Sequence, residues 1–120
     1  MVNTAFINSG GIIEQVYIGR QTFRKVTKIA AKIMILSDQI AGRGGKVKIL
    51  VNITKVKGIT ADAMLAAADT LNTILESKIA VYGGSKLLND LANLVIVAVG
   101  RTDSVMVFDT KKEAIRWLRR

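Results

Sequence analysis

The residues from Lys46 to Leu75 constrain the fold of this chain more than any other stretch, because they predict a buried strand that leads into a capped helix. The segment Lys46–Ile53 is rich in β-branched residues, contains no Gly or Pro, and follows Gly44 and Gly45, as expected of a strand. Its centre, Ile49–Val51, is continuously apolar. This pattern favours a central strand, covered on both faces, over an edge strand.

A helix is predicted to follow this strand after a short turn. Thr60 can accept a hydrogen bond from a free amide of the first helical turn, and Asp62 places a negative charge where the helix dipole favours one. Spacing of three and four residues groups the apolar side chains on one face, made of Met64, Ala67, Ala68, Leu71, Ile74 and Leu75. Asp69, Asn72, Thr73 and Glu76 are expected to face outward. A strand, a turn and an amphipathic helix form half of a βαβ unit, so the stretch predicts an α/β fold.

Strand and helix patterns also alternate in the rest of the chain. A short strand at Thr4–Ile7 and a second at Ile12–Ile18, closed by Gly19, are expected to form a hairpin. The remaining predicted elements are a helix from Arg20 or Gln21 to about Ala41, a strand at Lys78–Tyr82, a helix from Lys86, a strand at Ser104–Asp109, and a helix at Lys111–Arg120 capped by Asp109 or Thr110. We therefore expect one domain over residues 1–120, with a mainly parallel central sheet flanked by helices.

One segment supports two interpretations. Leu87, Leu88, Leu91, Leu94, Val95 and Ala98 have helical spacing, whereas Leu94–Val99 has the β-branched composition of a strand. The sequence therefore leaves residues 94–99 open between helix and strand.

The chain contains neither His nor Cys. Imidazole bases, thiolate nucleophiles, disulfides and His or Cys metal sites are therefore excluded. The nine acidic residues show no spacing that would gather two carboxylates on one helix face. We therefore predict no catalytic residues, no metal site and no cofactor, and expect the chain not to be an enzyme.

No predicted segment is suited to cross a membrane. The longest apolar run, Leu94–Val99, is far shorter than the roughly 20 residues that a membrane-spanning helix needs, and the N-terminus lacks the pattern of a secretory signal. We expect the chain to be soluble and cytoplasmic.

The formal net charge is +9, and residues 1–57 contain ten Lys or Arg against two acids. Within this half, basic residues recur every four positions along the first predicted helix: Arg20, Arg24, Lys28 and Lys32, with Lys25 beside them. Like charges at this spacing destabilise an isolated helix. Two interpretations stand: a solvated face, or a basic stripe that contacts an anionic partner such as a nucleic acid or an acidic lipid surface.

A second candidate anion site follows the strand Lys78–Tyr82. Gly83 and Gly84 precede Ser85, which is suited to cap a helix, and Lys86 adds a cation. Such a turn can expose amides to an anion, and it is equally explained as a tight turn with a helix cap.

Three segments resemble the SpoIIAA-like, or STAS, domain family, including its branch grouped with Sec14-type proteins. They are Lys46–Thr54, which is similar to the family's central strand, Lys78–Gly83, and Val107–Leu118, which is similar to the family's closing strand and helix. The resemblance implies a sheet of four or five strands with helices packed on it, and a regulatory or binding role without catalysis.

In the anti-sigma-antagonist branch of that family, a phosphorylatable Ser stands at the start of the helix after the central strand. Ala61 or Asp62 occupies that place here, and Thr60 is the nearby hydroxyl, to be read as a helix cap or as a phosphosite. We expect the domain to bind a protein partner through Gly58, Ile59, Thr60, Asp62 and Met64, or a small anionic or apolar ligand near the helix ends. The alternative function is a nucleic-acid or acidic-membrane binder that uses the basic stripe.

Overall fold

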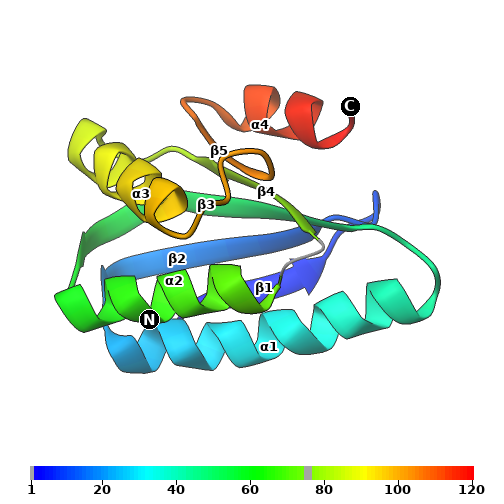
Figure 1. The fold of residues 1–120 in the computed structure, drawn as a ribbon, viewed down its shortest axis with the longest axis horizontal. Helices are drawn as coiled ribbons and strands as arrows, with labels where there is room; N and C mark the ends of the chain where they lie inside the picture. The colour runs from blue at the N-terminus through cyan, green and yellow to red at the C-terminus, as the bar shows by residue number, and fades with distance from the viewer. Residues whose placement is uncertain (1, 75–76) are drawn as a thin grey trace.

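The computed structural model describes residues 2–74 and 77–120, which form a five-stranded sheet with helices on both faces (Figure 1). The strands lie in the order in which they occur in the chain. They are β1 (Thr4–Ile7), β2 (Ile13–Gln21), β3 (Val47–Ile59), β4 (Ser77–Tyr82) and β5 (Val105–Phe108). β1 pairs with β2 in antiparallel fashion and all the other pairs are parallel. The predicted mainly parallel α/β fold and N-terminal hairpin are thus confirmed.

β3 lies at the centre of the sheet, as the sequence predicted. Ile49 and Leu50 are each only 1% exposed although their side chains point to opposite faces. Ile49 packs in a cluster with Ile33 of the first helix, and Leu50 packs with Trp117 of the last helix. The central strand is therefore buried on both sides.

Each helix begins at a hydroxyl residue that caps it. The helices are α1 (Phe23–Gly42), α2 (Ala61–Thr73), α3 (Lys86–Ala98) and α4 (Lys111–Leu118). The side chains of Thr22, Thr60, Ser85 and Thr110 each accept a hydrogen bond from an amide in the first helical turn, the N-cap interaction. The predicted caps at Thr60 and Ser85 are confirmed, and Thr110 rather than Asp109 caps α4.

The two faces of the sheet are covered unequally. α1 and α2 lie side by side on one face, as Figure 1 shows, and α3 packs on the same face through Ile96 against Ile79 and Val105. The opposite face carries α4, whose Trp117 and Leu118 pack on the sheet. None of the helices in the described ranges is both long and apolar enough to cross a bilayer.

Two predicted boundaries were wrong for the same reason. β2 continues through Gly19 to Gln21, so Arg20 belongs to a strand and α1 begins only at Phe23. β3 likewise continues through Gly58 to Ile59. The two strands pair along this extension, with register shifts after Val16 and Gly19. Gly19 has a φ of +78°, a conformation that glycine adopts without strain, so it bends the strand where the sequence suggested an end.

Residues 94–98 are helical, which settles the open choice for most of that segment, and Val99 caps the helix. Met64, Ala67, Ala68 and Leu71 of the predicted apolar face of α2 are half-buried and Ile74 is buried, and the face also includes the buried Ala63 and Ala66, which the prediction left out. Asp69, Asn72 and Thr73 are exposed as expected. The assignments made for Leu75 and Glu76 lie outside the described residues.

The guanidinium of Arg101 joins three elements at one end of the sheet. Arg101 is 8% exposed, and its Nη1 donates to the carbonyl oxygens of Leu71 and Ile74 at the end of α2. Its Nη2 donates to the Ser77 carbonyl at 3.0 Å, and its Nε to Ser104 Oγ at 2.7 Å. A cation at the C-terminus of a helix is favoured by the helix dipole. Arg101 therefore fixes the end of α2 to the start of β4.

We predict that Arg101→Met lowers the free energy of unfolding by about 3 kcal/mol, because it leaves buried carbonyl oxygens without donors. The exposed Arg119→Met is the matched control and should change stability by less than about 0.5 kcal/mol. Urea denaturation of both variants measures the difference. Equal stability of the two variants would show that the Arg101 contacts contribute nothing.

Candidate functional site

An apolar cavity of about 160 Å³ lies between the sheet and helices α2 and α3. Aliphatic side chains from the sheet form its floor, and side chains from the two helices form its roof. Among the described residues that line it, none carries a formal charge. The lining includes Ile49, Val51, Ile53, Ile79, Val81 and Val105 from the sheet and Met64, Ala67, Leu71, Leu88, Leu91, Ala92, Val95 and Ile96 from the helices.

The cavity arises because α2 and α3 do not fill the space above the sheet. Ala63 and Ala66 are the only fully buried residues of α2, and Ile96 is the only one of α3. Large apolar side chains of the same helices point outward instead, including Leu65, Leu87, Leu94 and Val97, which are 66–68% exposed. Protein interiors are otherwise close-packed. The space is partly open to solvent, and its lining lacks some of the packing contacts that a filled interior would provide.

Three of the four polar residues in the described cavity lining, Gln15, Tyr17 and Gln21, come from β2, and the fourth, Thr70, comes from α2. Gln15 is 5% exposed, and its Oε1 is buried without a hydrogen-bond partner in the described part of the chain. Tyr17 lies two residues further along the same face and is half-buried, and burial raises the pKa of Tyr17 to about 12. Gln21 is buried too, but Asn3 Nδ2 donates to its Oε1 at 2.8 Å. Gln15 is therefore the polar residue of this wall whose side-chain oxygen has no hydrogen-bond donor among the described residues.

The predicted partner-binding segment borders this cavity. Gly58 and Ile59 end β3, and Thr60 caps α2 with an Oγ1 that accepts from Ala63 N at 3.3 Å and donates to Asp62 Oδ1 at 2.5 Å. Ile59 and Met64 line the cavity, whereas Asp62 is exposed. The segment thus has an outward polar edge and an inward apolar side. The hydroxyl of Thr60 is engaged as a helix cap, and its phosphorylation stays a prediction.

The glycine turn before α3 is explained by close packing. A Cβ on Gly83 would lie 2.2 Å from Thr54 Cγ2, and one on Gly84 would lie 2.6 Å from Ile53 Cδ1. Ser85 Oγ accepts from Leu88 N, and Lys86 Nζ forms an exposed ion pair with Asp90 at 2.9 Å. Asn89 adds a buried amide oxygen without a partner among the described residues. An acceptor repels an anion, so binding of an anion at this turn stays a prediction without support from the geometry.

The basic stripe is shorter than predicted. Arg20 lies in β2, and the ammonium of Lys25 turns back to donate to the carbonyl oxygen of Ile18. Arg24, Lys28 and Lys32 remain on the exposed side of α1. The ion pairs of the described residues, Lys86–Asp90 and Lys111–Glu14, do not involve them.

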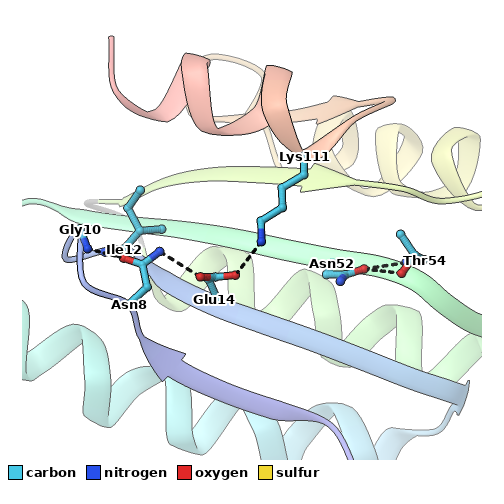
Figure 2. A network of polar contacts seen from close by, with 7 residues as sticks. All are labelled: Asn8, Gly10, Ile12, Glu14, Asn52, Thr54 and Lys111. Atoms are coloured by element: carbon cyan, nitrogen blue, oxygen red, sulfur yellow. Dashed lines mark hydrogen bonds and ion pairs between the residues drawn. The ribbon is translucent and has the colours of Figure 1, made fainter.

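The opposite face of the sheet carries a polar network beneath α4, shown in Figure 2. Glu14 Oε2 accepts from Asn8 Nδ2 at 3.0 Å, and Glu14 Oε1 lies 3.5 Å from Lys111 Nζ at the start of α4. Asn52 Oδ1 accepts from Thr54 Oγ1 at 2.7 Å. Nearby on this face, the Lys78 ammonium lies 4.3 Å from the centre of the Trp117 ring. The contacts of Lys111 with Glu14 and of Lys78 with Trp117 join α4 to the sheet. No group of three acidic side chains suited to a metal ion occurs in the described ranges.

Sequence reasoning missed the residues that define the cavity, above all Gln15 and Tyr17. A signal was present, because Gln15 and Tyr17 follow Ile13 at two-residue spacing and so share its buried face in a strand. An amide at an inward position of a strand is unusual and indicates a polar requirement inside.

Solved structures resemble this fold along nearly its whole length. An uncharacterised protein of the DUF3478 family from Shewanella loihica, with a SpoIIAA-like fold, has 15% identity and a TM-score of 0.65, with 98% of this chain and 92% of that chain covered. The anti-sigma factor antagonist SpoIIAA in its unphosphorylated form has 16% identity and a TM-score of 0.62, with 98% of each chain covered. The phosphorylated Bacillus SpoIIAA has 17% identity and a TM-score of 0.58, with 98% and 100% covered. At these identities the likeness shows the fold.

A search of curated proteins finds no match. A family model described as SpoIIAA-like matches residues 12–119, which include β2 to β5 and all four described helices. This chain therefore belongs to the SpoIIAA-like family.

Proposed function

We propose that this chain is a regulatory binding domain, without catalytic activity, that takes up a small apolar molecule in the cavity between the sheet and helices α2 and α3. SpoIIAA-like domains are a domain type involved in regulatory protein–protein interactions. The observation that carries the proposal is the uncharged cavity of about 160 Å³. An engineered cavity of about 150 Å³ in another protein stays dry and binds benzene, so the volume suits a ligand of that size.

The cavity also offers a way to regulate a partner. Ile59 and Met64 line it, and they flank Thr60 and Asp62 on the segment expected to bind a protein. A ligand that packs against Met64 contacts the first turn of α2 from inside. Its binding would change the affinity of this segment for a partner, and the partner would change the affinity for the ligand by the same factor.

The lining supports binding rather than catalysis. Its described polar residues are Gln15, Tyr17, Gln21 and Thr70, none of which is a carboxylate or an amine. The chain also has no His or Cys. A site without a general base and without an activated nucleophile can hold an apolar molecule but has little means to transform it.

Filling the cavity tests the proposal. We predict that toluene raises the melting temperature of the wild-type protein, because a ligand that binds the folded state stabilises it. Ala92→Leu places a larger side chain in the cavity wall, so it should stabilise the protein by about 1 to 2 kcal/mol and abolish the response to toluene. Ala98→Leu, at an exposed position of the same helix, is the matched control and should keep the response. Equal toluene responses in both variants would place binding elsewhere.

The titration of the Tyr17 phenol measures how deeply this part of the cavity wall is buried. Its pKa is about 12 in the folded state against an ordinary value of 10, so the folded protein retains a proton that the unfolded chain loses. The associated stability is complete below pH 10 and is lost as the pH rises towards 12. We predict that wild type loses about 2 kcal/mol more than Tyr17→Phe between pH 10 and pH 12, measured by urea denaturation. If the free energies of unfolding of wild type and Tyr17→Phe changed with pH in the same way, the phenol would be exposed to water in the folded protein.

A second function is supported by the exposed part of the basic stripe. Arg24, Lys28 and Lys32 lie on one face of α1, and a row of cations attracts anionic polymers or acidic lipid surfaces. We propose this surface as an additional contact site for a nucleic acid or an acidic membrane.

We predict that Arg24→Glu with Lys28→Glu lowers the salt concentration at which the protein elutes from heparin. The matched control is Lys112→Glu with Arg116→Glu, which makes the same charge change at the same spacing on the exposed side of α4. Equal losses in the two variants would attribute retention to net charge and remove the role of the stripe.

A further inference from the structure

Gln15 is the one polar residue among the described residues of the cavity wall that has a deeply buried side-chain atom without a hydrogen-bond partner. It is 5% exposed, and its Oε1 has no partner among residues 2–74 and 77–120. Its neighbours across the strands are apolar, since Val51 lies opposite on β3 and Ala5 on β1. A buried amide oxygen that lacks a donor loses its hydration without compensation. The side chain thus marks a place where an incoming donor would be favoured.

The second polar group of this wall is a neutral donor. Tyr17 lines the same cavity two residues further along β2. Because burial raises the pKa of Tyr17 to about 12, the phenol keeps its proton at neutral pH and can donate as well as accept. Gln15 and Tyr17 together present an amide and a hydroxyl, neither of them charged.

The absence of charged side chains from the described lining favours some ligand head groups over others. A carboxylate in this cavity would give up its hydration, and the described lining contains no Lys or Arg to compensate for the loss. A pure hydrocarbon would fill the volume and leave Gln15 Oε1 without a donor. A neutral hydroxyl group can donate to Gln15 Oε1, and it can also accept a hydrogen bond from a phenol such as that of Tyr17, which lines the same cavity.

On these grounds we propose that the cavity selects a small neutral molecule of about the size of benzene that carries a hydroxyl group, with Gln15 as the residue that recognises the hydroxyl. This inference rests on the proposed function, because it names the chemical class of the ligand for the same cavity. The Gln15 side chain is then a specificity determinant that a purely apolar receptor would not need.

Three probes of similar size and different head group test the inference: phenol, toluene and benzoate. Titration of the isotope-labelled protein, followed by NMR at neutral pH, gives the affinity of each. We expect phenol to bind about tenfold more tightly than toluene, as one hydrogen bond to a buried acceptor allows, and benzoate to bind more weakly than both. The side-chain amide signal of Gln15 should shift further with phenol than with toluene, because only phenol can form a hydrogen bond with it.

The variant Gln15→Met keeps the length of the side chain and removes its polar atoms. It should bind toluene at least as tightly as wild type and lose the preference for phenol. Tyr17→Phe is the companion variant and should reduce the preference in part. A phenol preference that survives in Gln15→Met would overturn the assignment of Gln15, even if the cavity binds ligands.

The probes also separate the two proposals. Equal binding of phenol and toluene by the wild-type protein would overturn the hydroxyl selectivity and leave the proposed apolar receptor standing. No binding of any probe would overturn both, with water as the remaining candidate to satisfy Gln15. Tight binding of benzoate would contradict the argument from charge.

Discussion

The structure depends on burying the central strand β3 from both sides. Ile49 and Leu50 are adjacent in sequence and point to opposite faces, and both are almost completely buried. Each face must therefore carry a helical layer, which α1, α2 and α3 supply on one side and α4 on the other. Burial of such aliphatic side chains stabilises the fold by about 1.5 to 3 kcal/mol for each side chain. The alternation of strand and helix follows from this requirement.

The unequal cover of the two faces produces the candidate site. α4 is short, but Trp117 and Leu118 fill the space beneath it. On the other face α1 buries four large aliphatic side chains, Val26, Ile29, Ile33 and Ile40, whereas α2 buries only Ala63 and Ala66, and α3 buries only Ile96. Because few side chains of these two helices reach the sheet, the space between the helices and the apolar sheet stays unfilled and forms the cavity. The loosely packed part of the molecule is the part that borders the segment expected to bind a partner.

Much of the fold could be predicted from the sequence because its signals are local. The apolar run at Ile49–Val51, the cap at Thr60 and the cap at Ser85 each act within a few residues. The errors have a non-local cause. β2 and β3 continue through Gly19 and Gly58 because each strand provides a partner for the other, and no pattern within either segment reports that pairing.

The candidate site was only partly predictable for a similar reason. Ile59 and Met64 lie on either side of the start of α2, but their contact with a cavity depends on how α2 and α3 sit over the sheet. Packing of two helices decides whether a space is filled, and periodicity cannot report it. The two-residue spacing of Ile13, Gln15 and Tyr17 can be read from the sequence, and it predicts that Gln15 and Tyr17 occupy inward positions of a strand. The burial of Gln15 Oε1 without a partner in the described part of the chain depends on the tertiary structure, which no local pattern reports.

The central claim is that a ligand in the cavity acts on the start of α2. Amide hydrogen exchange of the wild-type protein, with and without saturating toluene, tests it most directly. We expect slower exchange in α2, in α3 and at the end of β3, because a bound ligand suppresses their local opening, and unchanged exchange in α4 on the opposite face. Protection spread uniformly over all four helices, or absent from α2 and α3, would contradict the account.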